Sequence, residues 1–304
     1  MFVCKVTLGL LLALLLVCCV QAEDKITYKC FGMIKWMSVL NGCVFVCSAS
    51  ELSVGDLLVR ANRGIVRDAS EPKVVGDIAV DDEHDERNAD PCTSSGCMWP
   101  KSTDGKVYVP YVIANHFHEL QVIQRGLDSF SSVTCIRFIR HSNQRDYISI
   151  ESRSGIIKFF CHAQMLFLLY VGRRGYSQTV SLDRNGCIYH STVQHELLHA
   201  LGFNHEQCRN DRDNHIRVVW ENIIDSYKYA FDKIATLNQG TPYDYNSVMQ
   251  YHRTAFSKNG QATMVPIPNS NVAFDQATQM SQNDIKRVNN LYRCCKYHTN
   301  MAVE

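Results

Sequence analysis

Three histidines at fixed spacing are the residues of this sequence that are best placed to do chemistry. His195 and His199 are four positions apart, and His205 follows after Gly202. Positions i and i+4 lie on one face of a helix, so His195 and His199 can present two imidazole nitrogens to one metal ion. Gly202 permits a sharp turn where a side chain would clash, and this turn can deliver His205 as a third ligand. Three neutral imidazoles leave one position of a zinc ion open, which is typical of a catalytic zinc site.

Glu196 directly follows the first histidine and cannot join it as a ligand on the same helix face. Its carboxylate can instead act as the general base that takes a proton from an attacking water. The alternative interpretation is three ordinary surface or core histidines. Five specified residues at set spacing arise by chance in about one of ten thousand chains of this length, taking about 1 in 20 per position. We therefore expect zinc at His195, His199 and His205, with Glu196 as a catalytic residue.

A mixture of helices and strands must position these residues. Gly202 is the expected left-handed cap at the end of the motif helix, and Ser281 with Asp284 forms an amino-terminal capping pattern for a last helix. The motif helix is expected over 192–201. Apolar periodicity predicts two further helices, over 113–130 and 222–234. Alternation of apolar and polar residues predicts strands over 135–140, 147–151 and 178–182.

With these features, the sequence resembles the metzincin metalloproteases and, among them, the astacins. The astacin-type continuation of the motif occupies 205–213, and 243–251 is similar to the family's Met-turn. The resemblance implies an α+β fold, a two-lobed metzincin zinc-protease domain with a mixed twisted sheet and a long active-site helix, holding one Zn²⁺. It also implies that Met249 forms a hydrophobic floor beneath the zinc and that the hydroxyl of Tyr251 stabilises the oxyanion. Taken alone, Met249 and Tyr251 would be ordinary core residues.

Composition and the first residues point to an oxidising compartment. The chain has 304 residues, of which 46% are hydrophobic and 20% charged, and its net charge is +1. This balance argues against a nucleic-acid partner. Fourteen cysteines are typical of a secreted protein. The apolar run over 6–20 follows Lys5 and is shorter than the about 20 residues that a membrane span needs. We expect a cleaved signal peptide over 1–22 and a secreted monomer without a stable membrane anchor, stored in zymogen granules.

An acidic run over 81–87 interrupts the chain before the catalytic region and ends in Arg87. We interpret it as an exposed linker that an activating protease can cut. The expected domains are therefore the signal peptide, a pro-segment over 23–87 and an astacin-type catalytic domain over 88–304.

The resemblance extends into the pro-segment at 75–78. In the family, an aspartate in such a Gly-Asp element reaches the zinc and keeps the zymogen silent, which makes Asp77 the latency residue. A solvated loop aspartate is the alternative. Cleavage after Arg87 would free Asn88, and the resemblance places the new amino terminus beside Glu206, a carboxylate that needs a positive partner if it is buried.

The cysteines narrow the resemblance to a subgroup. Astacins share two disulfides, which correspond here to Cys135 with Cys294 and Cys161 with Cys187. The additional pair, Cys92 and Cys97, is similar to the six-cysteine astacins of fish, a group with hatching enzymes and nephrosin-like proteases. Cys208 and Cys295 have no partner in this scheme, and Cys295 could replace Cys294.

Two apolar stretches depart from the family pattern, one over 156–169 and one over 28–48. The first interrupts the segment that astacins use as the edge strand for extended substrate. Our hypothesis is that both derive from a retained intron or a faulty gene prediction, and an uninterrupted cDNA spanning codons 155 to 170 would contradict it. The alternative is a genuine loop insertion, which chain entropy permits at modest cost.

These features together predict a secreted zinc endopeptidase made as a zymogen. Its substrates would be extended protein segments, and the hatching-enzyme likeness suggests egg-envelope proteins. The alternative is a secreted zinc-binding protein whose proteolysis is impaired by the insertion over 156–169. An intact Glu196 argues against a pure binding protein, because metal binding alone does not require it.

Overall fold

The computed structural model describes the backbone of 37–40, 43–46, 73–75 and 78–80, and residues 96–114, 119–151, 171–182 and 188–294. The expected signal peptide over 1–22 lies outside the described residues. The chain divides into two units, Met1–Glu51 and Leu52–Glu304. In the first unit, β1 (Met37–Leu40) pairs antiparallel with β2 (Cys43–Val46). The second unit contains the histidine motif.

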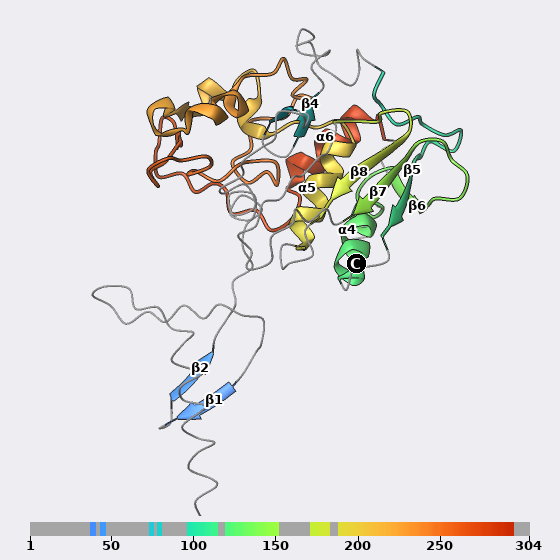
Figure 1. The fold of residues 1–304 in the computed structure, drawn as a ribbon, viewed down its shortest axis with the longest axis horizontal. Helices are drawn as coiled ribbons and strands as arrows, with labels where there is room; N and C mark the ends of the chain where they lie inside the picture. The colour runs from blue at the N-terminus through green and yellow to red at the C-terminus, as the bar shows by residue number, and fades with distance from the viewer. Residues whose placement is uncertain are drawn as a thin grey trace, which may run out of the picture. The chain divides into compact units, whose positions relative to one another are not determined.

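A four-stranded sheet forms one part of the second unit (Figure 1). Its strand order is β6-β5-β7-β8, with β5 at Val107–Ile113, β6 at Ile136–Arg140, β7 at Tyr147–Glu151 and β8 at Ser177–Ser181. All three pairings are parallel. Antiparallel pairs among the described residues occur in small sheets, such as β9 (Ile216–Val218) with β10 (Met264–Pro266). The expected strands are confirmed, although β6 begins one residue later than its pattern indicates, and β8 begins and ends one residue earlier.

Two helices pack together beside this sheet. Helix α4 (Leu120–Ser129) contacts α5 (His190–Ala200) and β6, and α5 also contacts β8. Figure 1 shows the segments that follow α5, coloured yellow to orange, on the opposite side of α5 from the sheet. This arrangement of helices and sheets confirms the α+β class. No helix in the described part of the chain is both long and apolar enough to cross a bilayer.

The helix expected over 113–130 begins later than its pattern predicts. Ile113 is the last residue of strand β5, and the helix begins at Leu120. The run over 107–113 carries apolar residues at most positions, because the strand is central in a parallel sheet and is buried over most of its length. Such a run lacks the alternation of a half-buried strand, so periodicity alone extends the helical pattern to include its last residue.

The α-helix expected over 222–234 is also wrong. Two short 3₁₀ segments, η4 (Trp220–Asn222) and η5 (Asp225–Phe231), occupy this region. Between them the backbone is extended at Ile223, whose side chain is fully buried. Ile223 bridges to Ser257, and the N–H of Ile224 donates to the carbonyl of Phe256. Tertiary pairing with this distant segment therefore overrides the local helical periodicity.

The last helix, α6 (Gln282–Leu291), begins as the capping pattern predicted. Ser281 accepts a hydrogen bond from the N–H of Asp284, and the Asp284 carboxylate accepts one from the N–H of Ser281. A disulfide between Cys135 and Cys294 joins the end of this region to the start of β6.

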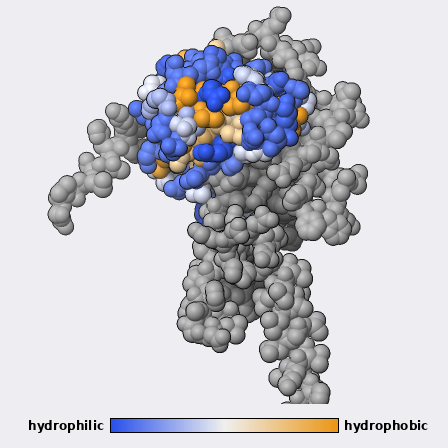
Figure 2. Space-filling view, turned by 90° about the vertical axis from the view of Figure 1, so that its left-hand side faces the viewer, coloured by the Kyte–Doolittle hydropathy of each residue, from blue (hydrophilic) through white to orange (hydrophobic). Residues whose placement is uncertain are grey.

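One hydrophobic core connects the sheet, α4, α5 and the segments that follow. Surface apolar side chains are few by comparison: the exposed large ones among the described residues are Leu120, Val133, Tyr176, Trp220, Ile224 and Leu237. On the face drawn in Figure 2, apolar residues are bordered by hydrophilic ones.

Helix α4 approaches α5 most closely at Gly126. A Cβ added there would lie 2.4 Å from Cγ1 and 2.7 Å from Cβ of Val193. Val193 is β-branched and buried, so it cannot rotate away freely. The absence of a side chain at Gly126 thus sets how closely α4 supports the motif helix.

We predict that Gly126→Ala destabilises the fold by about 1–3 kcal/mol through overpacking, despite the better helix propensity of alanine. Thermal unfolding measures the loss. Because the clash is with Val193, the double variant Gly126→Ala with Val193→Ala should lose less unfolding free energy than the two single variants lose together. Strict additivity of the two losses would contradict this account of the contact.

Candidate metal centre

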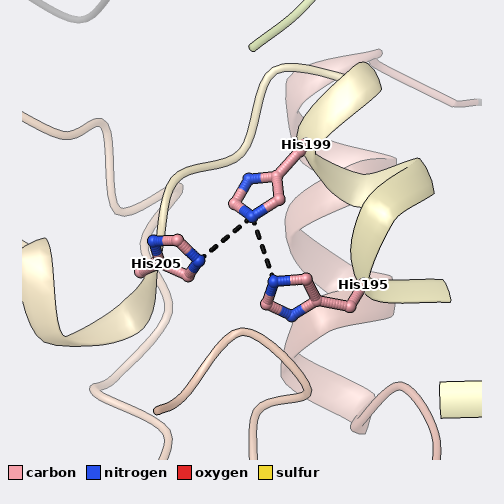
Figure 3. A group of neighbouring side chains, drawn as sticks. All are labelled: His195, His199 and His205. Carbon is pink, nitrogen blue, oxygen red and sulfur yellow. Dashed lines mark hydrogen bonds between the residues drawn. The ribbon is translucent and has the colours of Figure 1, made fainter. Parts of the chain in front are cut away.

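Helix α5 brings His195 and His199 to one face, as the spacing predicted (Figure 3). The helix ends just before Gly202, which adopts φ 105° and lets its N–H donate to the carbonyl of His199. A non-glycine residue is strained at such a φ value. The chain then turns back, and His205 faces the two helical histidines from the following loop.

The three imidazoles converge through their Nε2 atoms. Nε2 of His199 lies 3.0 Å from Nε2 of His195 and 3.1 Å from Nε2 of His205 (Figure 3). All three side chains are buried, and they form the one group of potential metal ligands found among the described residues.

The other ring nitrogens show why this arrangement fits a cation. Nδ1 of His195 lies 2.7 Å from the carbonyl oxygen of Val248, and Nδ1 of His199 lies 2.6 Å from that of Phe203. A carbonyl can only accept, so each Nδ1 donates and each neutral ring presents an Nε2 lone pair to the centre. Facing lone pairs repel one another unless a cation lies between them.

Zinc matches the size of this centre. Zn–N distances of about 2.0–2.1 Å in a tetrahedron give N···N separations of about 3.3 Å. The separations of 3.0 and 3.1 Å are within a few tenths of an ångström of that value. The hydrogen bonds to the carbonyls of Val248 and Phe203 are outer contacts that orient the ligands, and no sequence pattern indicates either carbonyl.

The Met-turn contacts this centre through its backbone. The carbonyl of Met249 accepts from the N–H of Glu206 at 3.0 Å, and that of the preceding Val248 accepts from His195. Met249 itself is buried. The turn therefore fixes both the first ligand and the peptide that follows the third.

The two expected catalytic side chains lie beside the histidines. Glu196 is fully buried on α5, next to His195. Tyr251 is 2% exposed, and its ring centroid lies 4.2 Å from that of His205. The N–H of Tyr251 donates to Oε1 of Gln207 at 3.3 Å, which ties this residue to the loop of the third histidine.

Glu206 is buried and already surrounded by positive groups. Its Oε1 accepts from Nη2 of Arg287 at 2.8 Å and from the N–H of Asp244 at 2.7 Å, while Oε2 accepts from Nη1 of Arg287 at 2.5 Å. Arg209 lies 3.4 Å from Oε1. Burial raises the pKa of the Glu206 carboxyl, and the Arg287 guanidinium opposes that rise. The resemblance predicts the freed amino terminus as the partner of Glu206, and no local pattern indicates Arg287, which is 81 residues away.

The remaining expected residues are only partly described. Cys97 is disulfide-bonded, and Cys208 is a buried thiol whose Sγ lies 3.5 Å from the carbonyl oxygen of Ala230. The following residues lie outside the described part of the chain: Asp77, Asn88, Cys92, Cys161, Cys187 and Cys295.

Comparison with known proteins agrees with this geometry. The peptidase family described as Astacin matches residues 97–293. Low choriolytic enzyme of Oryzias latipes is 47% identical over 212 residues, which cover 68% of this chain and 74% of that enzyme. High choriolytic enzyme 1 of the same species is 46% identical over 211 residues, with 68% and 74% covered.

A solved structure is similar as well. It is that of High choriolytic enzyme 1, a hatching enzyme zinc-protease from Oryzias latipes (medaka fish), which matches with a TM-score of 0.61 and 44% sequence identity. The match covers 68% of this chain and 100% of the solved one. The arrangement of α5, the sheet and the histidine loop is thus that of a known protease fold.

Zinc should stabilise the folded chain, because the converging lone pairs exist only in that state. Free zinc at about a thousand times its dissociation constant stabilises a protein by about 4 kcal/mol. Calorimetry should therefore show a melting temperature several degrees higher with zinc than with a chelator. His199→Ala, which removes the central ligand, should abolish the difference. An equal shift in that variant would place the zinc elsewhere.

Proposed function

This chain belongs to the astacin family of zinc metalloendopeptidases, and on that premise we propose that it is a secreted zymogen whose mature domain digests egg-envelope proteins. Family membership makes it a zinc enzyme that cleaves proteins. The observation that carries the proposal is the convergence of three buried Nε2 atoms beside a buried glutamate on one helix.

The catalytic roles follow from this arrangement. His195, His199 and His205 would hold a zinc ion, which supplies Lewis-acid polarisation of the scissile carbonyl and lowers the pKa of water. Glu196 takes a proton from the attacking water and passes it to the leaving amine as the carbon–nitrogen bond breaks. The hydroxyl of Tyr251 donates a hydrogen bond to the oxyanion.

We propose that a pro-segment over 23–87 keeps the protease inactive. It would lie between a signal peptide over 1–22 and the catalytic domain over 88–304. Strand β3 (Lys73–Val75) pairs with β4 (Ile78–Val80), with Val75 opposite Ile78. In the sequence, Asp77 lies between these two paired strands. Strand β3 contacts η5 of the catalytic domain, and Ile78 is buried. These contacts support a hairpin that docks on the catalytic domain and presents Asp77 to the zinc.

Activation would follow cleavage after Arg87 by another protease. We propose that the freed amino group of Asn88 enters the pocket lined in part by Gly202, Asn204, Glu206 and Asn238. Oε2 of Glu206 accepts from one Arg287 nitrogen, which leaves this oxygen a second acceptor position for an ammonium group. The mature enzyme would act as a monomer.

The substrate proposal rests on the relatives. Two of them are named choriolytic enzymes, and the solved structure is that of a hatching enzyme. A secreted protease of this type would meet egg-envelope proteins outside the cell, and soluble fragments released from isolated egg envelopes would measure that activity. Envelopes left intact by a chain that cleaves an unstructured protein would contradict this substrate.

A second candidate is a secreted zinc-binding protein with impaired proteolysis. The apolar stretch over 156–169 favours it, because this stretch interrupts the segment that pairs with substrate in relatives. These residues lie outside the described part of the chain. A folded, zinc-loaded but inert chain that gains activity when 156–169 are deleted would support this candidate.

Glu196→Gln should abolish proteolysis while leaving zinc in place, because the amide cannot accept the proton. The chain is expressed through a secretory pathway, trimmed at Arg87 and given an unstructured protein as substrate. We expect a loss of at least about 10²–10⁴-fold in kcat with unchanged zinc content. A chelator should silence the wild type. Cleavage that survives both treatments would come from a contaminating protease or a different site.

Asp77→Ala should release activity in the untrimmed chain, because the carboxylate would no longer reach the zinc. Asp81→Ala, in the acidic linker, is the matched control and should leave the chain silent until trimming. Cleavage of the unstructured protein before and after trimming at Arg87 measures both. An untrimmed Asp77→Ala chain that stays as silent as the wild type would remove Asp77 from latency.

A further inference from the structure

Helix α6 is distant in sequence from the histidine motif, yet one of its side chains reaches the backbone that orients His195. Oδ1 of Asp284 accepts from Oγ of Ser247 at 2.6 Å, and Oδ2 accepts from the N–H of Val248 at 3.0 Å. The carbonyl of Val248 in turn accepts from Nδ1 of His195. Val248 therefore links Asp284 to His195: its N–H bonds Asp284, and its carbonyl sets the tautomer and orientation of the His195 ring.

A second side chain of α6 reaches the loop of the third ligand. Arg287 is one helical turn after Asp284 and donates two hydrogen bonds to Glu206, which directly follows His205. The N–H of the same Glu206 donates to the carbonyl of Met249. The peptide that carries His205 is therefore held at its side chain by α6 and at its backbone by the Met-turn.

Packing alone does not require charged side chains at these buried positions. Asp284 and Glu206 are each 2% exposed and Arg287 is 7% exposed. Burying a charge costs several kcal/mol unless it is paired and hydrogen-bonded, and apolar residues of similar volume would pack at least as well. The capping of α6 uses Oδ2 of Asp284 on the N–H of Ser281, whereas Oδ1 bonds Ser247 of the Met-turn.

We propose that α6 clamps the metal centre at two points, with Asp284 and Arg287 as positioning residues that orient His195 and His205 for zinc without touching it. The inference rests on the zinc site of the proposed function and deepens it. Outer partners of metal ligands typically change metal affinity by about 10–100-fold when they are lost.

Zinc affinity tests the clamp independently of proteolysis. Dissociation constants for Zn²⁺ are measured on the full chain by competition with a chromophoric chelator at fixed pH. Asp284→Asn and Arg287→Lys should each weaken binding by about 10–100-fold. The visible absorption of the Co²⁺-loaded variants should also shift, because the ligand rings no longer hold their native orientation.

Two control variants separate positioning from stability. Ser281→Ala removes the hydroxyl that caps α6 and donates to Oδ2 of Asp244, but it leaves the bonds of Asp284 to Ser247 and Val248 in place. It should lower the melting temperature while its zinc affinity stays within about twofold, since both bonds from Asp284 to the Met-turn remain. Lys286→Gln changes a charge on the exposed face of the same helix and should alter neither quantity.

The clamp is overturned if Asp284→Asn and Arg287→Lys keep the zinc affinity and the Co²⁺ spectrum of the wild type. Helix α6 would then be a packing element only.

If Asp284→Asn does not fold, the variant Ser247→Ala tests the clamp instead. It removes only the hydroxyl between Oδ1 of Asp284 and the N–H of Met249, and should weaken zinc binding by about tenfold. Unchanged affinity there would equally overturn the clamp. A wild-type chain that binds no zinc would instead contradict the proposed function.

Discussion

Repulsion between the facing imidazole lone pairs of His195 and His199 is the constraint on which this structure depends. The Nδ1 hydrogen bonds of His195 and His199 leave their Nε2 atoms unprotonated and facing the centre. Such an arrangement is stable only around a cation, and it lasts only if the backbone holds each ring against rotation. The surrounding structure supplies that restraint through the carbonyls of Val248 and Phe203, the turn at Gly202 and the backbone of Met249.

Support for the metal centre comes from segments far apart in the chain. Helix α4 packs against the motif helix at a glycine, so the two helices approach closely beside the sheet. Helix α6 bonds to the Met-turn and to Glu206 through buried charged groups. Buried charges are costly when unpaired, and here each carboxylate accepts from several donors. The same bonds that satisfy these charges also fix the ligand loops.

Strand β3, in the proposed pro-segment, contacts the unit that holds the metal centre. Strand β3 pairs with β4 and lies against η5. Segment η5 is 3₁₀ rather than α because Ile223 and Ile224 pair with the segment at 256–257. The segment that β3 contacts is therefore shaped by the pairing of 223–224 with 256–257, which lie on either side of the Met-turn in sequence.

Short-range patterns were sufficient to predict the metal ligands and two helix boundaries. The spacing of His195 and His199, the cap at Gly202 and the capping box of Ser281 depend on residues within about one or two helical turns of each other, so helical geometry alone specifies them. Tertiary structure decided the rest: the strand at 107–113, the break at Ile223, the carbonyls that orient the histidines and the partner of Glu206. Each of these depends on a contact between segments tens of residues apart, and burial in three dimensions, which local periodicity does not encode, selects that contact.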